Sequence, residues 1–213
     1  MININQNEYI CCLVNIHLQF MQKSYIICNQ RGGAMSNLEF ECAFLDIDVV
    51  EFKKKIEKMK LEKIGENFQK RYVYDFNPVN PNSWIRLRTN GKRTTLAIKD
   101  IKNKNSIGGT SKLETEVENF AATNEMLNRM GYYARNYQEN KREEYLYKDV
   151  IVKIDYWPQI EPYIKIEGKC EQDVLDAALE LELPEDKMTT LDVQSIYKQI
   201  YGIDLLNIRE LRF

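Results

Sequence analysis

Six short segments of the chain place charged residues at every second position, with apolar residues between and around them. They are Glu39–Glu41, Arg86–Arg88, the run that ends at Lys99, Glu114–Glu116, Lys153–Asp155 and Lys165–Glu167. Successive side chains of a β-strand point to opposite faces, so each segment predicts a strand with one charged and one apolar face. A solvated sheet face is the ordinary interpretation of any one strand. Six such strands favour a closed sheet with a charged interior and an apolar outside that helices cover.

The remaining apolar spacing and turn signals complete a mixed α and β pattern. Helical spacing predicts helices that end near Lys60, over residues 119–129, over 172–183 and over 193–201. Further strands are expected over residues 68–75, 84–88, 94–99, 113–117, 145–152 and 154–157, with a last strand after Pro162. The sequence Thr89-Asn90-Gly91-Lys92 predicts a hairpin turn, and residues 102–110 predict a loop.

The order and spacing of these charged motifs resemble the CYTH proteins, also called triphosphate tunnel metalloenzymes. That family includes class IV adenylate cyclases and thiamine and inorganic triphosphatases. Its strands carry E-x-E-x-K, R-x-R, a lysine, E-x-E, a late basic residue, an Asp and a closing E-x-E, and the similarity spans about residues 37–213. The resemblance implies an α+β fold: a closed antiparallel eight-stranded β-barrel, a tunnel, with helices packed outside, formed by one domain over residues 35–213.

The resemblance also implies roles for the charged residues, although it assigns no catalytic residue. Phosphate-binding positions are Arg86, Arg88, Lys99, Arg142 and Lys165, and Lys70 is a further candidate. Metal-binding positions are Glu39, Glu41, Asp155 and Glu167, and Glu114 and Glu116 are other lumen residues. Arginine forks suit phosphate oxygens, and carboxylates suit Mg²⁺ or Mn²⁺, the expected cofactor. The alternative is that these residues neutralise one another as salt bridges inside the lumen.

Two residues depart from the family pattern. Ala43 stands where the first motif has its lysine, and Lys165 stands where the last motif has its first glutamate. Lys165 could restore a phosphate contact, or it could reach Glu167 or Asp155 and displace a metal. Lys153, two residues before Asp155, adds to the second alternative. The sequence leaves both alternatives open.

Composition narrows the classes of function. The 213 residues suffice for one core, and a net charge of −2 argues against nucleic-acid binding, while a small anionic ligand such as a triphosphate, a polyphosphate or ATP needs only local positive charge. The five cysteines lack metal spacing, and no stretch reads as a signal peptide or membrane span, which indicates a cytoplasmic protein. The sequence is compatible with a homodimer.

Residues 1–34 differ in composition from the remainder. They hold three of the five cysteines and the only histidine, His17. The sequence Arg31-Gly32-Gly33 before Met35 is typical of a translated ribosome-binding site, so we expect Met35 as the start and residues 1–34 as a disordered or non-native leader. A short apolar segment packed on the barrel or on a second subunit is the alternative. Without His17, histidine-based nucleophilic schemes and histidine-ligated zinc are excluded from the domain.

Two functions from different classes therefore follow from the sequence. The first is a divalent-metal-dependent enzyme that acts on a triphosphate, as a triphosphatase or as a class IV-type adenylate cyclase. The second is a catalytically impaired module of the same fold that binds a polyanion or nucleotide. The same tunnel can host either reaction, so the fold alone does not choose.

Overall fold

Eight antiparallel strands close into a barrel in the computed structural model, which describes residues 38–213. The strands are β1 (Leu38–Phe44), β2 (Glu62–Asp75), β3 (Ser83–Thr89), β4 (Thr94–Ile101), β5 (Thr110–Glu116), β6 (Ala134–Tyr147), β7 (Val150–Tyr156) and β8 (Tyr163–Gly168). Their order is β6-β2-β3-β4-β5-β1-β8-β7, and pairing of β7 with β6 closes the circle. Two short strands extend the sheet: β9 (Met188–Thr189) pairs with β1, and β10 (Glu210–Leu211) runs parallel to β6.

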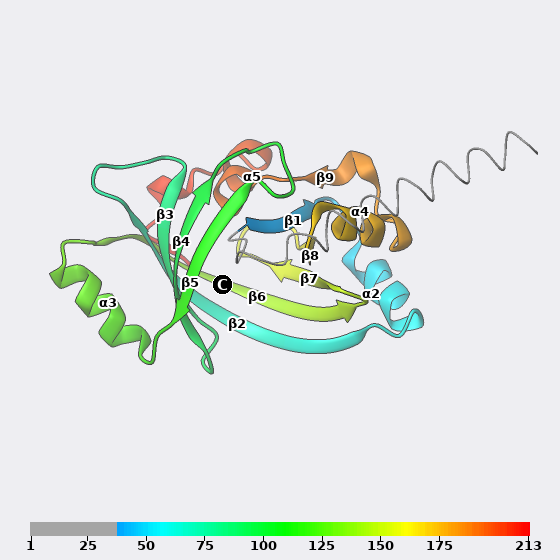
Figure 1. The fold of residues 1–213 in the computed structure, drawn as a ribbon, viewed down its shortest axis with the longest axis horizontal. Helices are drawn as coiled ribbons and strands as arrows, with labels where there is room; N and C mark the ends of the chain where they lie inside the picture. The colour runs from blue at the N-terminus through cyan, green and yellow to red at the C-terminus, as the bar shows by residue number, and fades with distance from the viewer. Residues whose placement is uncertain (1–37) are drawn as a thin grey trace, which may run out of the picture. The chain divides into compact units, whose positions relative to one another are not determined.

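Among residues 38–213, four α-helices lie outside the barrel. They are α2 (Val49–Lys58), α3 (Phe120–Arg129), α4 (Glu171–Glu180) and α5 (Val193–Ile200), together with 3-10 turns over Glu185–Lys187 and Leu205–Asn207. Asp48, Asn119 and Asp192 cap α2, α3 and α5 by accepting hydrogen bonds from backbone N–H groups of the first turn. Figure 1 shows α3 beside β3 and β4, with α2 and α4 toward the opposite end of the barrel. The predicted α+β tunnel with outer helices is confirmed.

The apolar faces of the strands point outward and form the core with these helices. Cys42 and Phe44 of β1, Ile154 of β7, and Ile164 and Ile166 of β8 pack against α2 and α4. A second cluster joins Leu87 and its neighbours on β2 and β3 to α3. Because alternate residues fill these two clusters, the charged residues between them are left facing the barrel interior. A third cluster lies on the inward face, where Ala43, Trp157 and Tyr163 pack with α5.

One carboxylate on the outer side of the barrel is unusually well hydrogen-bonded. Glu143 of β6 accepts from Lys53 Nζ at 2.7 Å, Lys63 Nζ at 3.1 Å, Tyr145 Oη at 2.7 Å and Tyr156 Oη at 2.8 Å. Burial raises the pKa of Glu143, but these lysine and tyrosine donors lower it by more, to about 2. This cluster ties α2 to the long β2–β6 pair.

The structure differs from the predicted elements at two boundaries. β2 begins at Glu62 rather than near residue 68, because β6 pairs with it along its whole length and supplies hydrogen bonds to a stretch without alternation. The turn between β6 and β7 lies at Lys148–Asp149, where a continuous strand was expected, and Lys148 adopts a positive φ of 52°. β9 and β10 were not predicted, since two-residue strands carry no pattern of their own.

The expectations about residues 1–34 and about Met35 lie outside the described residues. Among the helices of the described part of the chain, none has the length and apolar character that crossing a membrane requires.

Candidate functional site: a charged tunnel

The barrel encloses a cavity of about 580 Å³, within the range of about 300–1,000 Å³ usual for small-molecule sites. All eight strands contribute to its lining, and α5 adds polar side chains at one part of it. Twelve lysines and arginines line the cavity against seven aspartates and glutamates, although the whole chain has a net charge of −2. The lumen is therefore an electropositive compartment inside a slightly acidic protein.

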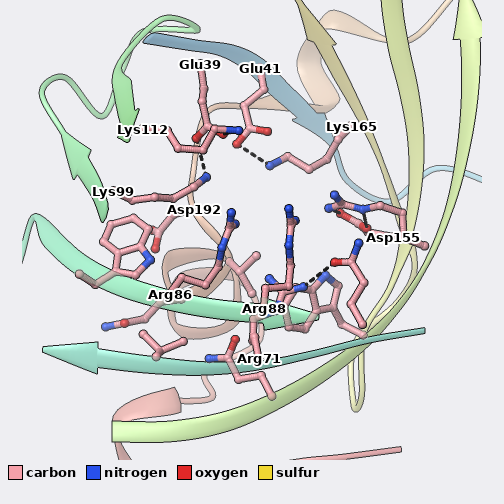
Figure 2. Close-up of a pocket in the computed structure, with 18 of the residues that line it drawn as sticks. Glu39, Glu41, Arg71, Arg86, Arg88, Lys99, Lys112, Asp155, Lys165 and Asp192 are labelled. Carbon is pink, nitrogen blue, oxygen red and sulfur yellow. Dashed lines mark hydrogen bonds and ion pairs between the residues drawn. The ribbon is translucent and has the colours of Figure 1, made fainter. Parts of the chain in front are cut away.

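Arginines gather on the side of the lumen formed by β2 and β3, where Arg71 and Arg86 are buried and Arg88 is partly buried. Arg86 and Arg88 alternate along β3 and point into the cavity side by side (Figure 2), and Arg71 of β2 is the cross-strand partner of Arg88. Glu114 is the carboxylate nearest to this group, with an oxygen 2.9 Å from Arg86 Nη2 and 3.7 Å from Arg88 Nη2. Arg86, burial and Arg142 together lower the pKa of Arg88 to about 9, although Glu114 opposes them. The arginine group is thus short of negative charge.

Arg71 has no carboxylate within salt-bridge distance in the described structure. Its Nη2 donates to Gln69 Oε1 at 3.0 Å and to Asn140 Oδ1, and its guanidinium lies 4.6 Å from the ring centre of Trp157. Burial lowers the pKa of Arg71, and Arg86 and Arg88 lower it further. The buried Nε atoms of Arg71 and Arg86 find no hydrogen-bond acceptor among the described residues. Both therefore retain donor capacity for an anion.

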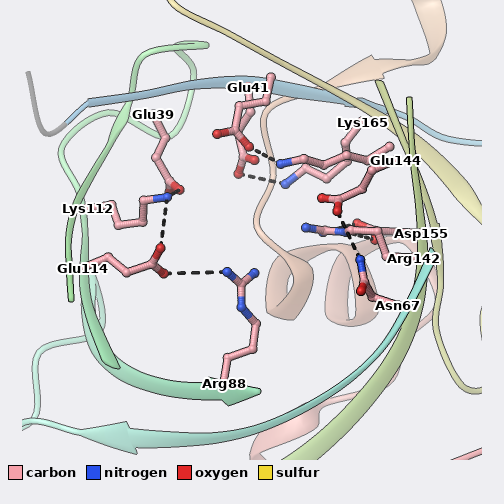
Figure 3. Close-up of polar contacts among 12 residues, drawn as sticks. Glu39, Glu41, Asn67, Arg88, Lys112, Glu114, Arg142, Glu144, Asp155 and Lys165 are labelled. Carbon is pink, nitrogen blue, oxygen red and sulfur yellow. Dashed lines mark hydrogen bonds and ion pairs between the residues drawn. The ribbon is translucent and has the colours of Figure 1, made fainter. Parts of the chain in front are cut away.

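On the opposite side of the lumen, each carboxylate of β1 and β8 meets an ammonium group (Figure 3). Glu39 lies 2.5 Å from Lys99 Nζ and 3.0 Å from Lys112 Nζ, and Glu41 lies 2.8 Å from Lys165 Nζ. Burial raises the pKa of Glu39, but Lys99 and Lys112 lower it to about 2. These carboxylates are therefore ionised and paired at neutral pH.

The pairing continues on β7 and β6. Glu167 pairs with Lys153, and the two oxygens of Asp155 accept from Arg142 Nε at 2.6 Å and Nη2 at 2.7 Å. Asp155 is fully buried, and this bidentate contact has the geometry that a guanidinium and a carboxylate prefer.

Solved structures share this architecture at low sequence identity. A Pyrococcus horikoshii protein matches with a TM-score of 0.64 and 20% identity over 73% of this chain and 96% of its own. A Vibrio parahaemolyticus protein described as a candidate adenylate cyclase matches with a TM-score of 0.65 and 14% identity over 78% and 98%. A candidate adenylyl cyclase from Hippeastrum, described as having a dominant triphosphatase activity, matches with a TM-score of 0.53 and 13% identity over 80% and 98%. The chain has the CYTH tunnel fold.

The CYTH fold is found here without support from sequence comparison. No protein-family model and no curated protein matches the sequence.

Nearly all the predicted lumen residues line the CYTH tunnel. The lining includes Glu39, Glu41, Arg86, Arg88, Lys99, Glu114, Arg142, Asp155, Lys165 and Glu167. Glu116 differs: it ends β5 at the rim, its side chain is 62% exposed, and it pairs with Arg93. The barrel wall stops there, so alternation no longer directs this side chain inward.

Sequence reasoning selected the wrong basic residue on β2. Lys70 is exposed outside the barrel, and the neighbouring Arg71 faces the lumen. Tyr72 and Tyr74, which share the face of Lys70, pack toward α3, so the alternation rule applied to these tyrosines would have placed Lys70 outside. Other lining residues that sequence reasoning missed are Lys112, Gln138, Glu144 and Trp157.

The described residues do not fit the divalent cation that the CYTH resemblance implies. Among residues 38–213 there is no group of three or more histidine, cysteine, aspartate or glutamate side chains that could hold a metal ion. Glu39, Glu41, Asp155 and Glu167, the predicted ligands, each face an ammonium or guanidinium group instead. A cation adjacent to a carboxylate repels Mg²⁺ or Mn²⁺ and competes for the same oxygen atoms. The metal cofactor stays a prediction.

Proposed function

We propose that this protein binds a triphosphate in the CYTH tunnel and acts on it as a triphosphatase or as a class IV-type adenylate cyclase. The observation that carries the proposal is the group formed by the buried Arg71 and Arg86 and the partly buried Arg88, which has Glu114 as its nearest carboxylate. A buried charge without a partner costs free energy, so an anion bound between these arginines would stabilise the group. A chain of phosphate groups supplies several negative charges in a compact shape.

The residues of the lumen suit phosphoryl chemistry by position and charge. Reactions of triphosphates are catalysed chiefly by positioning and electrostatic stabilisation, which arginine and lysine supply. Arg86 and Arg88 offer guanidinium forks, and Lys99 lies on the neighbouring strand β4 and lines the same cavity. Burial lowers the pKa of Lys99 to about 8, even though Glu39 raises it, so this lysine remains mostly charged at neutral pH. The descriptions of the Vibrio and Hippeastrum neighbours name these two activities and so support both of them as candidates.

A second candidate is binding of a polyanion without turnover. It is favoured by the ion pairs on Glu39, Glu41, Asp155 and Glu167, which occupy the carboxylates that a catalytic cation would require. In that function the arginine side of the lumen holds the anion, and the paired side serves as a neutral wall.

Turnover assays with the full chain separate these functions. Tripolyphosphate, ATP and thiamine triphosphate would each be incubated with Mg²⁺, with Mn²⁺ or with EDTA, and phosphate release and cyclic AMP would be measured. Calorimetry on the same ligands gives the affinities, with sulfate as a simple-anion control. Turnover supports the first function, and binding without turnover supports the second. If tripolyphosphate binds no better than sulfate, both proposals are wrong.

A further inference from the structure

Two lysines face each other across β7 and β8 inside the lumen. Lys153 and Lys165 are direct cross-strand partners, a pairing that is unfavourable for like charges. Both side chains are nearly buried, with 8% and 12% of their surface exposed. Something in the site therefore offsets their repulsion.

Two glutamates provide that compensation. Glu41 and Glu167 are themselves cross-strand partners on β1 and β8, and each accepts one of the lysines: Lys165 lies 2.8 Å from Glu41, and Lys153 pairs with Glu167. The four side chains form an alternating cluster of charges at the wall of the cavity. Two ammonium groups carry the same charge as one divalent cation, so the cluster is as neutral as two carboxylates that share a divalent metal.

Neighbouring residues leave room for this arrangement. Ala43 is the β1 partner of Lys165 and has a short side chain, so the long lysine can reach along the strand to Glu41. Asp155 cannot take either lysine as its main partner, because Arg142 occupies both of its oxygens.

We propose that Lys153 and Lys165 take the place of the divalent cation, so that the tunnel binds the phosphate groups of a triphosphate without Mg²⁺ or Mn²⁺. This inference rests on the proposed function. An ammonium group has three N–H donors, and a carboxylate that accepts one of them leaves others for phosphate oxygens. Both lysines line the same cavity as Arg86 and Arg88, so one extended anion can touch both sides of the lumen.

The first experiment uses the unaltered full-length protein. Its affinity for tripolyphosphate is measured by calorimetry in EDTA and in an excess of Mg²⁺. The inference predicts that binding in EDTA is at least as tight as binding with Mg²⁺. Binding detected only with Mg²⁺ or Mn²⁺ would overturn the inference and leave the proposed function standing. Absence of binding in every buffer would overturn both.

The second experiment removes the two charges. Lys153→Gln and Lys165→Gln should each weaken tripolyphosphate binding in EDTA by about tenfold or more, as expected for loss of a charge-assisted contact. Lys54→Gln is the matched control, because Lys54 is exposed on α2 and, within residues 38–213, pairs only with Glu51 of its own helix. It should leave the affinity unchanged. Wild-type affinity in both lumen variants would contradict the inference.

The double variant tests the exchange directly. Without the lysines, Glu41 and Glu167 are free to hold a cation, so the double variant should bind Mn²⁺ in the absence of phosphate, as seen by electron paramagnetic resonance and by a rise in melting temperature. The wild type should not. Equal Mn²⁺ affinity in both proteins would show that the lysines do not occupy the place of the metal. If the double variant does not fold, the wild-type comparison in EDTA and Mg²⁺ still decides.

Discussion

Replacing Arg88 by glutamine should make the protein more stable and a poorer binder at the same time. Arg88 is held beside Arg86 and the pKa of its guanidinium is lowered to about 9. One pKa unit corresponds to about 1.4 kcal/mol, and the usual pKa of arginine is about 12.5, so keeping this group charged costs the folded state about 5 kcal/mol at neutral pH. The attraction to Glu114 is already included in this cost, and solvent at the partly exposed guanidinium reduces it. We therefore expect a net gain of about 1–2 kcal/mol.

The same substitution should weaken the binding of tripolyphosphate. A charge-assisted hydrogen bond contributes about 1.5–3 kcal/mol, so the affinity should fall by about 10- to 150-fold. Thermal melts and calorimetry measure the two effects, and the melting temperature should rise by about 2–4 °C for each kcal/mol gained. Arg129→Gln is the matched control, because Arg129 is exposed on α3 and, in the described part of the chain, pairs only with Glu125 of its own helix. It should change neither quantity appreciably.

The pH dependence of tripolyphosphate binding tests the charge of Arg88 in a second way. An anion favours the protonated form of Arg88, so affinity falls as pH rises through the pKa of about 9 in the free protein. Lys99, with a pKa of about 8, begins the decline earlier in both proteins. The decline above pH 8 should be shallower in Arg88→Gln. If Arg88→Gln were less stable than the wild type and bound tripolyphosphate with unchanged affinity, the reasoning would be refuted.

Three further substitutions test other parts of the structure. Glu143→Gln should lower the free energy of unfolding at pH 7 by about 1–3 kcal/mol in urea titrations, and the difference should vanish between pH about 4.3 and about 2, where the native carboxylate protonates. Glu114→Gln should tighten tripolyphosphate binding severalfold and lower the melting temperature, since Arg86 loses its partner; weaker binding would show that Glu114 helps to hold the ligand. Asp155→Asn should lower the free energy of unfolding by about 3–5 kcal/mol, because it leaves the buried Arg142 without its carboxylate partner. A much smaller loss in urea titrations would contradict this structural role.

The sequence predicts the barrel wall well because alternation is a local property. The charged positions of β1, β3 and β8 follow from neighbours two residues away, and the structure places them in the lumen. On β2 both faces carry a basic residue, so the apolar residues that share each face have to decide which face is inside. Lys70 shares its face with Tyr72 and Tyr74, which pack outside the barrel, so the prediction of Lys70 was wrong and Arg71 on the other face lines the lumen.

The pairing inside the lumen could not be predicted in the same way. Lys165 reaches Glu41 and Lys153 reaches Glu167 because closure of the barrel sets the register of β8 between β1 and β7. Register depends on strands far apart in the chain, and no local pattern contains it. The sequence therefore raised the question of a displaced metal, and only the cross-strand geometry shows which lysine meets which carboxylate.

Alternation around a closed barrel also governs how this protein can change over evolutionary time. A single inserted or deleted residue within a strand would exchange lumen charges for core side chains along the rest of that strand, so strand length is constrained more tightly than residue identity. Point substitutions at positions that line the cavity, such as Lys165, leave the outer clusters of α2, α3 and α4 untouched. Charge can thus move from one strand to another by single substitutions, and ligand preference can drift while the wall of the barrel stays the same.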